Sequence, residues 1–215
     1  MEVAARLSER SVAGARSRAE HEVRALLDSA LVVLGRAGID GLTVSEVLTE
    51  AALSTRAFYR HFRSKDELVL ALYASESERA NARRGARLAS IDDPRAALDA
   101  WIASVLALAY EPRQARRTRV LQAEGARLRH EFPVEFGRIF ADELGPLRDI
   151  LQRGLDAGAF PDAEPAIDAP VVHALVWSFA QARLDGSPVT LADAQRRARR
   201  YVERALGADH VADRA

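Results

Sequence analysis

Prolines and helix-capping residues divide this sequence into helix-length segments, and no segment between them alternates polar and apolar residues as a β-strand would. Pro94, Pro112 and Pro133 each stand where a helix can begin, because a proline at the first helical position gives up an N–H that is unpaired there anyway. Alanine is frequent, while β-branched and aromatic residues are comparatively sparse, which also favours helix. The sequence therefore predicts an all-α protein.

The spacing of apolar residues and caps predicts nine helices. The pairs Thr43–Glu46 and Ser64–Glu67 have the spacing of capping boxes. Gly145-Pro146 is expected to kink or split the seventh helix. The predicted helices cover about 19–37, 43–51, 55–62, 64–90, 94–110, 112–130, 133–158, 165–185 and 190–206.

Composition excludes several classes of function. The chain has 215 residues and no cysteine, which excludes disulfide scaffolds, thiolate metal sites and thiol nucleophiles. It contains no His-Glu-x-x-His, P-loop or Gly-x-Ser-x-Gly motif, and its five histidines lie far apart in the sequence, so we expect no catalysis, metal or cofactor. The apolar run from Trp101 to Tyr110 is shorter than the roughly 20 residues that span a bilayer. The first residues do not resemble a signal peptide, so we expect a cytoplasmic, nucleoid-associated protein.

Charge is distributed unevenly in a chain that is neutral overall. The 31 basic and 31 acidic residues give a formal net charge of zero. Residues 54–65 contain four basic residues (Arg56, Arg60, Arg63 and Lys65) and no acidic one, so this stretch carries +4 and the remainder −4. This stretch includes the second of two short predicted helices joined by the three residues 52–54, which is typical of a helix-turn-helix. A solvated basic surface is the alternative interpretation.

The residue types in this second short helix suit contacts to DNA. Arg56, near the start of the helix, has a planar fork of donors that matches O6 and N7 of guanine. Thr55 can bond a phosphate or a base, and Tyr59, His61 and Lys65 can hold phosphates and fix the register.

The stretch from Gly41 to Leu68, and most specifically the run Phe-Tyr-Arg-His-Phe-Arg-Ser-Lys at 58–65, resembles the DNA-binding module of TetR-type (TetR/AcrR family) transcriptional regulators. The resemblance implies an N-terminal three-helix helix-turn-helix module followed by a six-helix bundle for ligand binding and dimerisation. It implies a DNA-binding domain at 19–65 and a ligand-binding and dimerisation domain at 66–215. Residues 1–18 contain Arg6, Arg10, Arg16 and Arg18 and no firm apolar period, so we expect a flexible basic arm there. This arm is either a disordered terminus, which is the preferred interpretation, or a segment that touches DNA.

The resemblance also implies roles for individual residues. Ser54, Thr55, Arg56 and Tyr59 would face the major groove, while Phe58 and Phe62 would be core. Two departures from the family pattern are Ala52, where the turn usually has glycine, and Leu48, where alanine is common. The full set of expected DNA-binding residues is Thr43, Ser45, Ser54, Thr55, Arg56, Tyr59, Arg60, His61 and Lys65.

The C-terminal region is predicted only in outline, since plain core packing explains most of its apolar residues equally well. Its expected ligand-pocket residues are Trp101, Val105, Arg119, Gln122, Phe136, Phe140, His173 and Trp177. The helix near 170–184 is apolar around most of its circumference, which indicates burial on two sides, by its own core and by a second copy. The expected dimer residues are Val172, Leu175, Val176, Phe179, Tyr201 and Val202.

These observations predict a homodimeric repressor that leaves an inverted-repeat DNA operator when it binds a small-molecule effector, whose identity the sequence does not give. An enzyme and a helical partner-binding module without DNA are the rival classes. The arginines at 196, 197, 199 and 200 could form a second nucleic-acid patch, but a solvated or salt-bridged face is the preferred interpretation.

Overall fold

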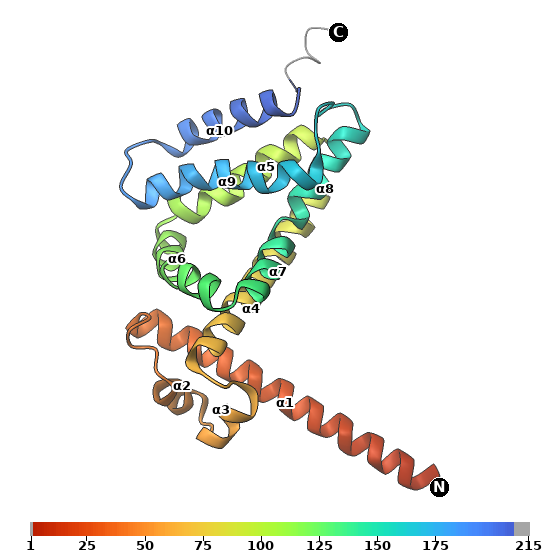
Figure 1. Ribbon diagram of the computed structural model, residues 1–215, viewed down its shortest axis with the longest axis vertical. Helices are drawn as coiled ribbons and strands as arrows, with labels where there is room; N and C mark the ends of the chain where they lie inside the picture. The colour runs from red at the N-terminus through yellow and green to blue at the C-terminus, as the bar shows by residue number, and fades with distance from the viewer. Residues whose placement is uncertain (1, 209–215) are drawn as a thin grey trace. The chain divides into compact units, whose positions relative to one another are not determined.

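The computed structural model describes the backbone of residues 2–208, and their side chains except at 2–13, 117, 120, 121, 123 and 124. Within that range the chain forms ten α-helices and no strand, which confirms the all-α prediction (Figure 1). No helix among the described residues is both long enough and apolar enough to cross a membrane. The helices are α1 (Glu2–Ala37), α2 (Val44–Ala51), α3 (Thr55–His61), α4 (Lys65–Ala89), α5 (Pro94–Tyr110), α6 (Pro112–Glu131), α7 (Pro133–Glu143), α8 (Gly145–Asp156), α9 (Pro165–Leu184) and α10 (Leu191–Ala205).

Two compact units share the chain, one ending at Ser75 and the other beginning at Glu76. The boundary falls inside α4, so this one helix contributes its first turns to the first unit and the rest to the second.

The first unit packs α2 and α3 against α1. Leu26 and Ala30 of α1, Val47 of α2 and Phe58 of α3 are fully or almost fully buried. Because each of these short helices buries only one face, its opposite face is left for solvent or a partner.

Helix α1 differs from its prediction because it begins at Glu2 and not near residue 19. The prediction relied on apolar periodicity, which reports burial and not helicity. Residues 2–18 contain no proline, and an Arg16–Glu20 ion pair one turn apart, at 3.1 Å, supports helix on an exposed surface. The end of α1 agrees with the prediction, since Gly38 follows with a φ of +70°.

The second unit is built around α5, which packs against α6, α8, α9 and α10. Trp101, Ile102 and Leu106 of α5 lie in its core, together with Val176 of α9 and Val202 of α10. The predicted helix 133–158 is split at Gly145 into α7 and α8, so seven helices follow α3 where six were expected. Pro146 explains the break, because it offers no N–H to continue the helix ladder.

Candidate nucleic-acid interface and effector region

Helices α2 and α3 begin at hydroxyl caps and are joined by a tight turn. The Thr43 hydroxyl accepts a hydrogen bond from the Glu46 N–H at 3.2 Å, and the Ser54 hydroxyl accepts one from the Ala57 N–H at 3.2 Å. Ala52 ends α2 with φ 52° and ψ 38°, and it is the only non-glycine residue with positive φ in the described part of the chain. The turn therefore keeps the left-handed conformation that glycine adopts readily, and Ala52 occupies it with strain between its Cβ and the backbone. Leu48, the other departure, is buried.

The capping hydroxyls remain available to a ligand. A hydroxyl that accepts a bond from a backbone N–H still has its own O–H to donate. Thr43, Ser45 and Ser54 are all exposed, so their hydroxyls can reach an acceptor outside the protein.

Helix α3 has one buried aromatic face and one exposed polar face. Phe58 is fully buried and Phe62 is 5% exposed, as the resemblance implied. Thr55, Arg56 and Tyr59 are exposed, and Tyr59 packs edge-to-face on Phe58 with ring centroids 5.3 Å apart. This contact orients the Tyr59 ring while its hydroxyl stays in solvent.

Two of the predicted DNA-binding residues are held by an acid that the sequence analysis missed. The Glu22 carboxylate of α1 bonds His61 Nε2 at 2.7 Å and Arg60 Nη1 at 3.2 Å. The His61 hydrogen bond is the main cause that lowers the pKa of Glu22, and the charges of Arg60 and Arg18 add to it, against a smaller opposing effect of burial. The His61 side chain is only 10% exposed, so the structure corrects its expected phosphate contact to a bridge between α3 and α1. No sequence spacing relates residues 22 and 61, and only the fold brings them together.

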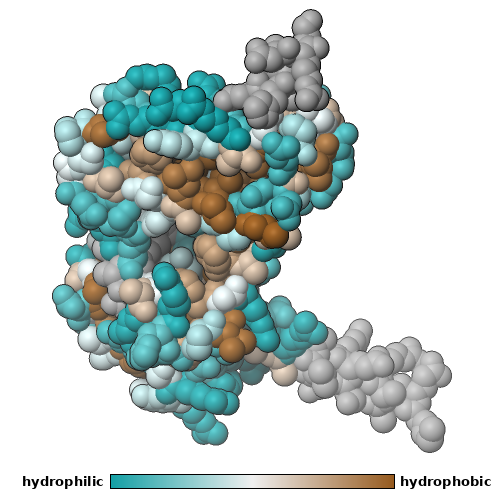
Figure 2. Space-filling model, turned by 45° about the horizontal axis from the view of Figure 1, so that its top comes forward, coloured by the Kyte–Doolittle hydropathy of each residue, from teal (hydrophilic) through white to brown (hydrophobic). Residues whose placement is uncertain are grey.

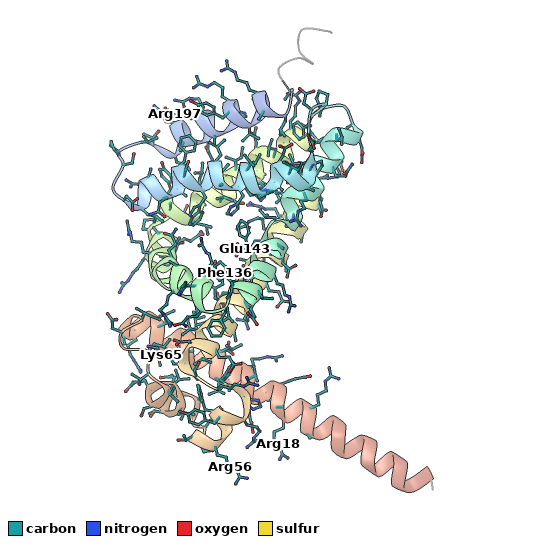
Figure 3. All side chains as sticks on the ribbon, in the orientation of Figure 1. Arg18, Arg56, Lys65, Phe136, Glu143 and Arg197 are labelled. Carbon is teal, nitrogen blue, oxygen red and sulfur yellow. The ribbon has the colours of Figure 1, made fainter. Side chains whose placement is uncertain are left out.

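Basic side chains of α1 lie in the same unit as α3. Arg18 is close enough to Glu22 to act on its pKa, and Figure 3 shows Arg18 and Arg56 projecting from α1 and α3 in the lower part of the view. The side chains of Arg6 and Arg10 lie outside the described residues.

Lys65 is the first residue of α4 and is partly exposed. The Ser64 hydroxyl caps this helix by accepting from the Glu67 N–H at 3.1 Å, and the Glu67 carboxylate accepts from the Arg63 N–H. This capping box fixes where Lys65 leaves the backbone.

Four of the eight predicted pocket residues form one aromatic cluster in the second unit. The His173 ring lies 5.2 Å from Phe140 and 6.2 Å from both Trp101 and Trp177, measured between centroids. Burial, and secondarily the charge of Arg84, lowers the pKa of His173 to about 4. His173 is therefore an uncharged imidazole near neutral pH.

The other four predicted pocket residues lie outside this cluster of rings. Arg119 is exposed and donates to the Leu184 carbonyl at 3.1 Å, so it is not a buried cation beside the rings. Gln122 donates to the Gln181 side chain at 2.7 Å, and Val105 lies in the core. Phe136 packs under Arg129, whose guanidinium carbon is 5.2 Å from the centroid of the Phe136 ring. None of the eight lines the open groove of about 430 Å³ between α4 and α8, formed by Gly85, Leu88, Ala89, Gly145, Pro146, Asp149, Ile150 and Arg153.

The structure corrects three of the six predicted dimer residues, whereas Leu175 and Phe179 stay partly exposed and Tyr201 is 50% exposed. Val172, Val176 and Val202 are at most 4% exposed and belong to the core of their own unit, so they are not available to a partner. The exposed apolar residues of α9 are instead Ile167 and Val171, one turn apart and 59% and 61% exposed. Because α9 is apolar on nearly every side, its sequence could not show which face points inward. Figure 2 shows apolar surface on this unit beside hydrophilic side chains.

The arginine run of α10 is largely engaged within its own unit. Arg199 bonds Asp99 at 2.8 Å, Arg196 bonds Asp193, and Arg200 lies over the Tyr201 ring. These contacts favour the interpretation of a salt-bridged face over a second nucleic-acid patch.

Comparison with known proteins identifies the N-terminal module. Residues 26–72 match the model for bacterial regulatory proteins of the tetR family. No curated protein matches the sequence. A TetR transcription regulator from Haloarcula marismortui is 18% identical with a TM-score of 0.63, over 88% of this chain and 98% of that one. NemR of Escherichia coli in its reduced form is 21% identical with a TM-score of 0.64, over 86% and 96%. FadR from Bacillus subtilis, in complex with stearoyl-CoA, is 16% identical with a TM-score of 0.60, over 85% and 98%. These structural likenesses show that the fold is shared.

Proposed function

We propose that the chain is a TetR-type transcriptional regulator and not an enzyme, because residues 26–72 match the tetR family model and the fold is shared with such regulators, and that it acts as a homodimeric repressor of transcription in the cytoplasm. Each copy reads one half of an inverted-repeat operator, and a small-molecule effector releases the dimer from DNA. The exposed polar face of α3 is the observation that carries this proposal. It presents Arg56 and Tyr59 on a helix whose first turn contains no acid.

Base reading is assigned to the exposed first turn of α3. Arg56 has no intramolecular partner among the described residues to compete for its guanidinium, which is free to bond guanine in the major groove. Thr55, Tyr59 and the Ser54 hydroxyl complete the reading face. Steric occlusion of the promoter is the proposed mechanism, since a dimer held on its operator by this face would block access of polymerase to the same DNA.

Phosphate contacts are assigned to residues around this face. Thr43 and Ser45 offer hydroxyls at the start of α2, and Lys65 offers its ammonium at the start of α4. Arg60 stays ion-paired with Glu22 at 3.2 Å, but it is half-exposed and can share a phosphate through its remaining donors. His61 acts through Glu22 by fixing α3 on α1.

Release requires that the effector bind one conformation of the dimer more tightly than the other. Helix α4 belongs to both units, so a shift of its second part by an effector is transmitted along the helix to the module. The stearoyl-CoA complex of FadR supports the idea that this fold accommodates a small-molecule ligand.

The test compares Arg56→Ala with Arg197→Ala in fluorescence anisotropy on a duplex selected by the wild-type protein. Both variants remove one exposed arginine, from α3 and α10 respectively (Figure 3). Arg56→Ala is expected to weaken binding by about 1–3 kcal/mol, and Arg197→Ala by a few tenths at most. Equal effects of the two substitutions would contradict the role of α3.

A further inference from the structure

A polar stripe of α4 meets the aromatic cluster of the second unit. Ser77, Asn81 and Arg84 are spaced four and three residues apart, so they share one face of α4. Ser77 donates to the Glu143 carboxylate of α7, and Asn81 donates to the Asp142 carbonyl at 2.6 Å. Phe140, which contacts His173, lies one turn before Glu143 on α7. Figure 3 shows Glu143 and Phe136 projecting from α7 toward the side where α6 lies.

The guanidinium of Arg84 has far more N–H donors than it finds acceptors in this cluster. Its only hydrogen bond in the described structure goes to the Asn81 side-chain oxygen at 3.3 Å, which uses one of five N–H groups. No described carboxylate lies within ion-pair distance of it. Burial lowers the pKa of Arg84, against the opposing influence of Glu143, as expected for a cation that is desolvated without full compensation.

The carboxylate of Glu143 offsets the partly buried positive charge of Arg84 only in part. Burial raises the pKa of Glu143, against the hydrogen bond from Ser77 and the charge of Arg84. The Glu143 carboxylate accepts from the Ser77 hydroxyl and forms no ion pair with Arg84 in the described structure. The Arg84 guanidinium therefore keeps donors that one further anionic group could satisfy.

A second unpaired donor lies among the rings. Trp101 is fully buried, and its Nε1–H is the one buried side-chain polar atom without a partner among the described residues. Buried polar groups are normally paired, so an orphaned indole N–H indicates an absent acceptor. Arg84, Phe140, Glu143, His173 and Trp177 each keep part of their surface exposed, so solvent reaches the cluster.

We propose that this cluster is the effector site, and that it takes a carboxylate with a planar apolar body. The carboxylate pairs with the guanidinium of Arg84, the planar body packs among Phe140, His173 and Trp177, and an acceptor atom of the ligand receives the Trp101 N–H. This assignment rests on the proposed function, since it gives the chemistry of the effector that the function requires. A cationic ligand would gain from the aromatic faces but would be repelled by Arg84.

The first experiment measures ligand binding alone, by isothermal titration calorimetry on the full chain. The probes are 2-naphthoate and 2-naphthylmethylammonium, which share a ring system and differ in charge. The variant is Arg84→Gln, and its matched control is Arg83→Gln, which removes the neighbouring exposed arginine of the same helix. Saturable binding of 2-naphthoate is expected, weakened at least about tenfold by Arg84→Gln and less than about twofold by Arg83→Gln.

Further variants locate the ligand and guard against misfolding. Trp101→Phe keeps an aromatic ring and removes the N–H, so it is expected to weaken the binding of 2-naphthoate several-fold if a carboxylate oxygen that pairs with Arg84 also accepts from Trp101. The chain has two tryptophans, and both lie in the cluster, so their emission should change on binding. If Arg84→Gln loses helical signal in circular dichroism, Arg84→Lys replaces it. That variant keeps the charge but loses the bidentate fork, and is also expected to bind more weakly.

The outcomes separate this proposal from the function on which it rests. No binding of 2-naphthoate, equal binding by Arg84→Gln, or tighter binding of the ammonium probe would overturn the proposed ligand class. Arg84-dependent binding that also releases the protein from its selected operator supports both proposals. Arg84-dependent binding that leaves the operator complex intact supports the site but overturns effector release by it.

Discussion

Replacing Ala52 by glycine should stabilise the helix-turn-helix. Ala52 is exposed and adopts φ 52°, where its Cβ crowds the backbone at a cost of about 1–2 kcal/mol. Glycine removes that cost but adds about 0.4–1 kcal/mol of backbone entropy to the unfolded chain. The difference is a net stabilisation of about 0.5–1 kcal/mol.

The assay is urea unfolding of the full chain, followed by far-ultraviolet circular dichroism, which reports both units. Two control substitutions test the same reasoning on α1. Gly38→Ala introduces a Cβ at φ +70° with no atom within 4 Å, so it should destabilise through backbone strain alone. Gly35→Ala also meets nothing within 4 Å but has no positive φ, so it should stabilise by up to about 1 kcal/mol through helix propensity.

The directions of the three stability changes together show whether Ala52 is strained. A lower unfolding midpoint for Ala52→Gly, accompanied by the expected loss in Gly38→Ala, would refute the reasoning. That pair of results would mean that residue 52 does not occupy the left-handed region.

Three further predictions concern the operator contacts, the dimer and pH. Lys65→Ala should weaken binding to all DNA sequences alike and reduce the salt slope by about 1, measured by anisotropy over a salt series, whereas a sequence-selective loss would count against a phosphate contact. Val171→Glu, on the exposed face of α9, should give monomers in light scattering, while Val32→Glu, which replaces another exposed valine, on α1, should not; dimers of both variants would rule out this face. Because the pKa of His173 falls from 6.5 to about 4 on folding, the unfolded chain binds a proton first as the pH drops. The contribution of neutral His173 to stability is therefore complete above pH 6.5 and is lost as the pH falls toward 4. Urea midpoints measured over this pH range should depend less on pH in His173→Asn than in the wild type. An unchanged slope would contradict the burial of His173.

The sequence predicted those features that depend on neighbouring residues. The caps at Thr43 and Ser64 are local, because each hydroxyl accepts from an N–H three positions later, and both occur in the structure. The strained turn at Ala52 was predictable for the same reason.

Features that depend on how helices pack were beyond sequence reasoning. Glu22 and His61 are 39 positions apart, and no local pattern relates them. The sequence indicated Arg119 as the arginine of the ligand pocket, but the charge that acts on His173 in the aromatic cluster belongs to Arg84 of α4. The inward face of α9 was also ambiguous, since a helix that is apolar all round carries no sign of its orientation.

Selection of bound sequences from random duplex DNA tests the central claim most directly. The full-length protein should enrich an inverted repeat whose two half-sites are read by two copies of α3. The same selection with Arg56→Ala should give the same repeat with one base position relaxed in each half-site. Enrichment of no motif, or of an unrepeated motif unaffected by Arg56→Ala, would contradict the account.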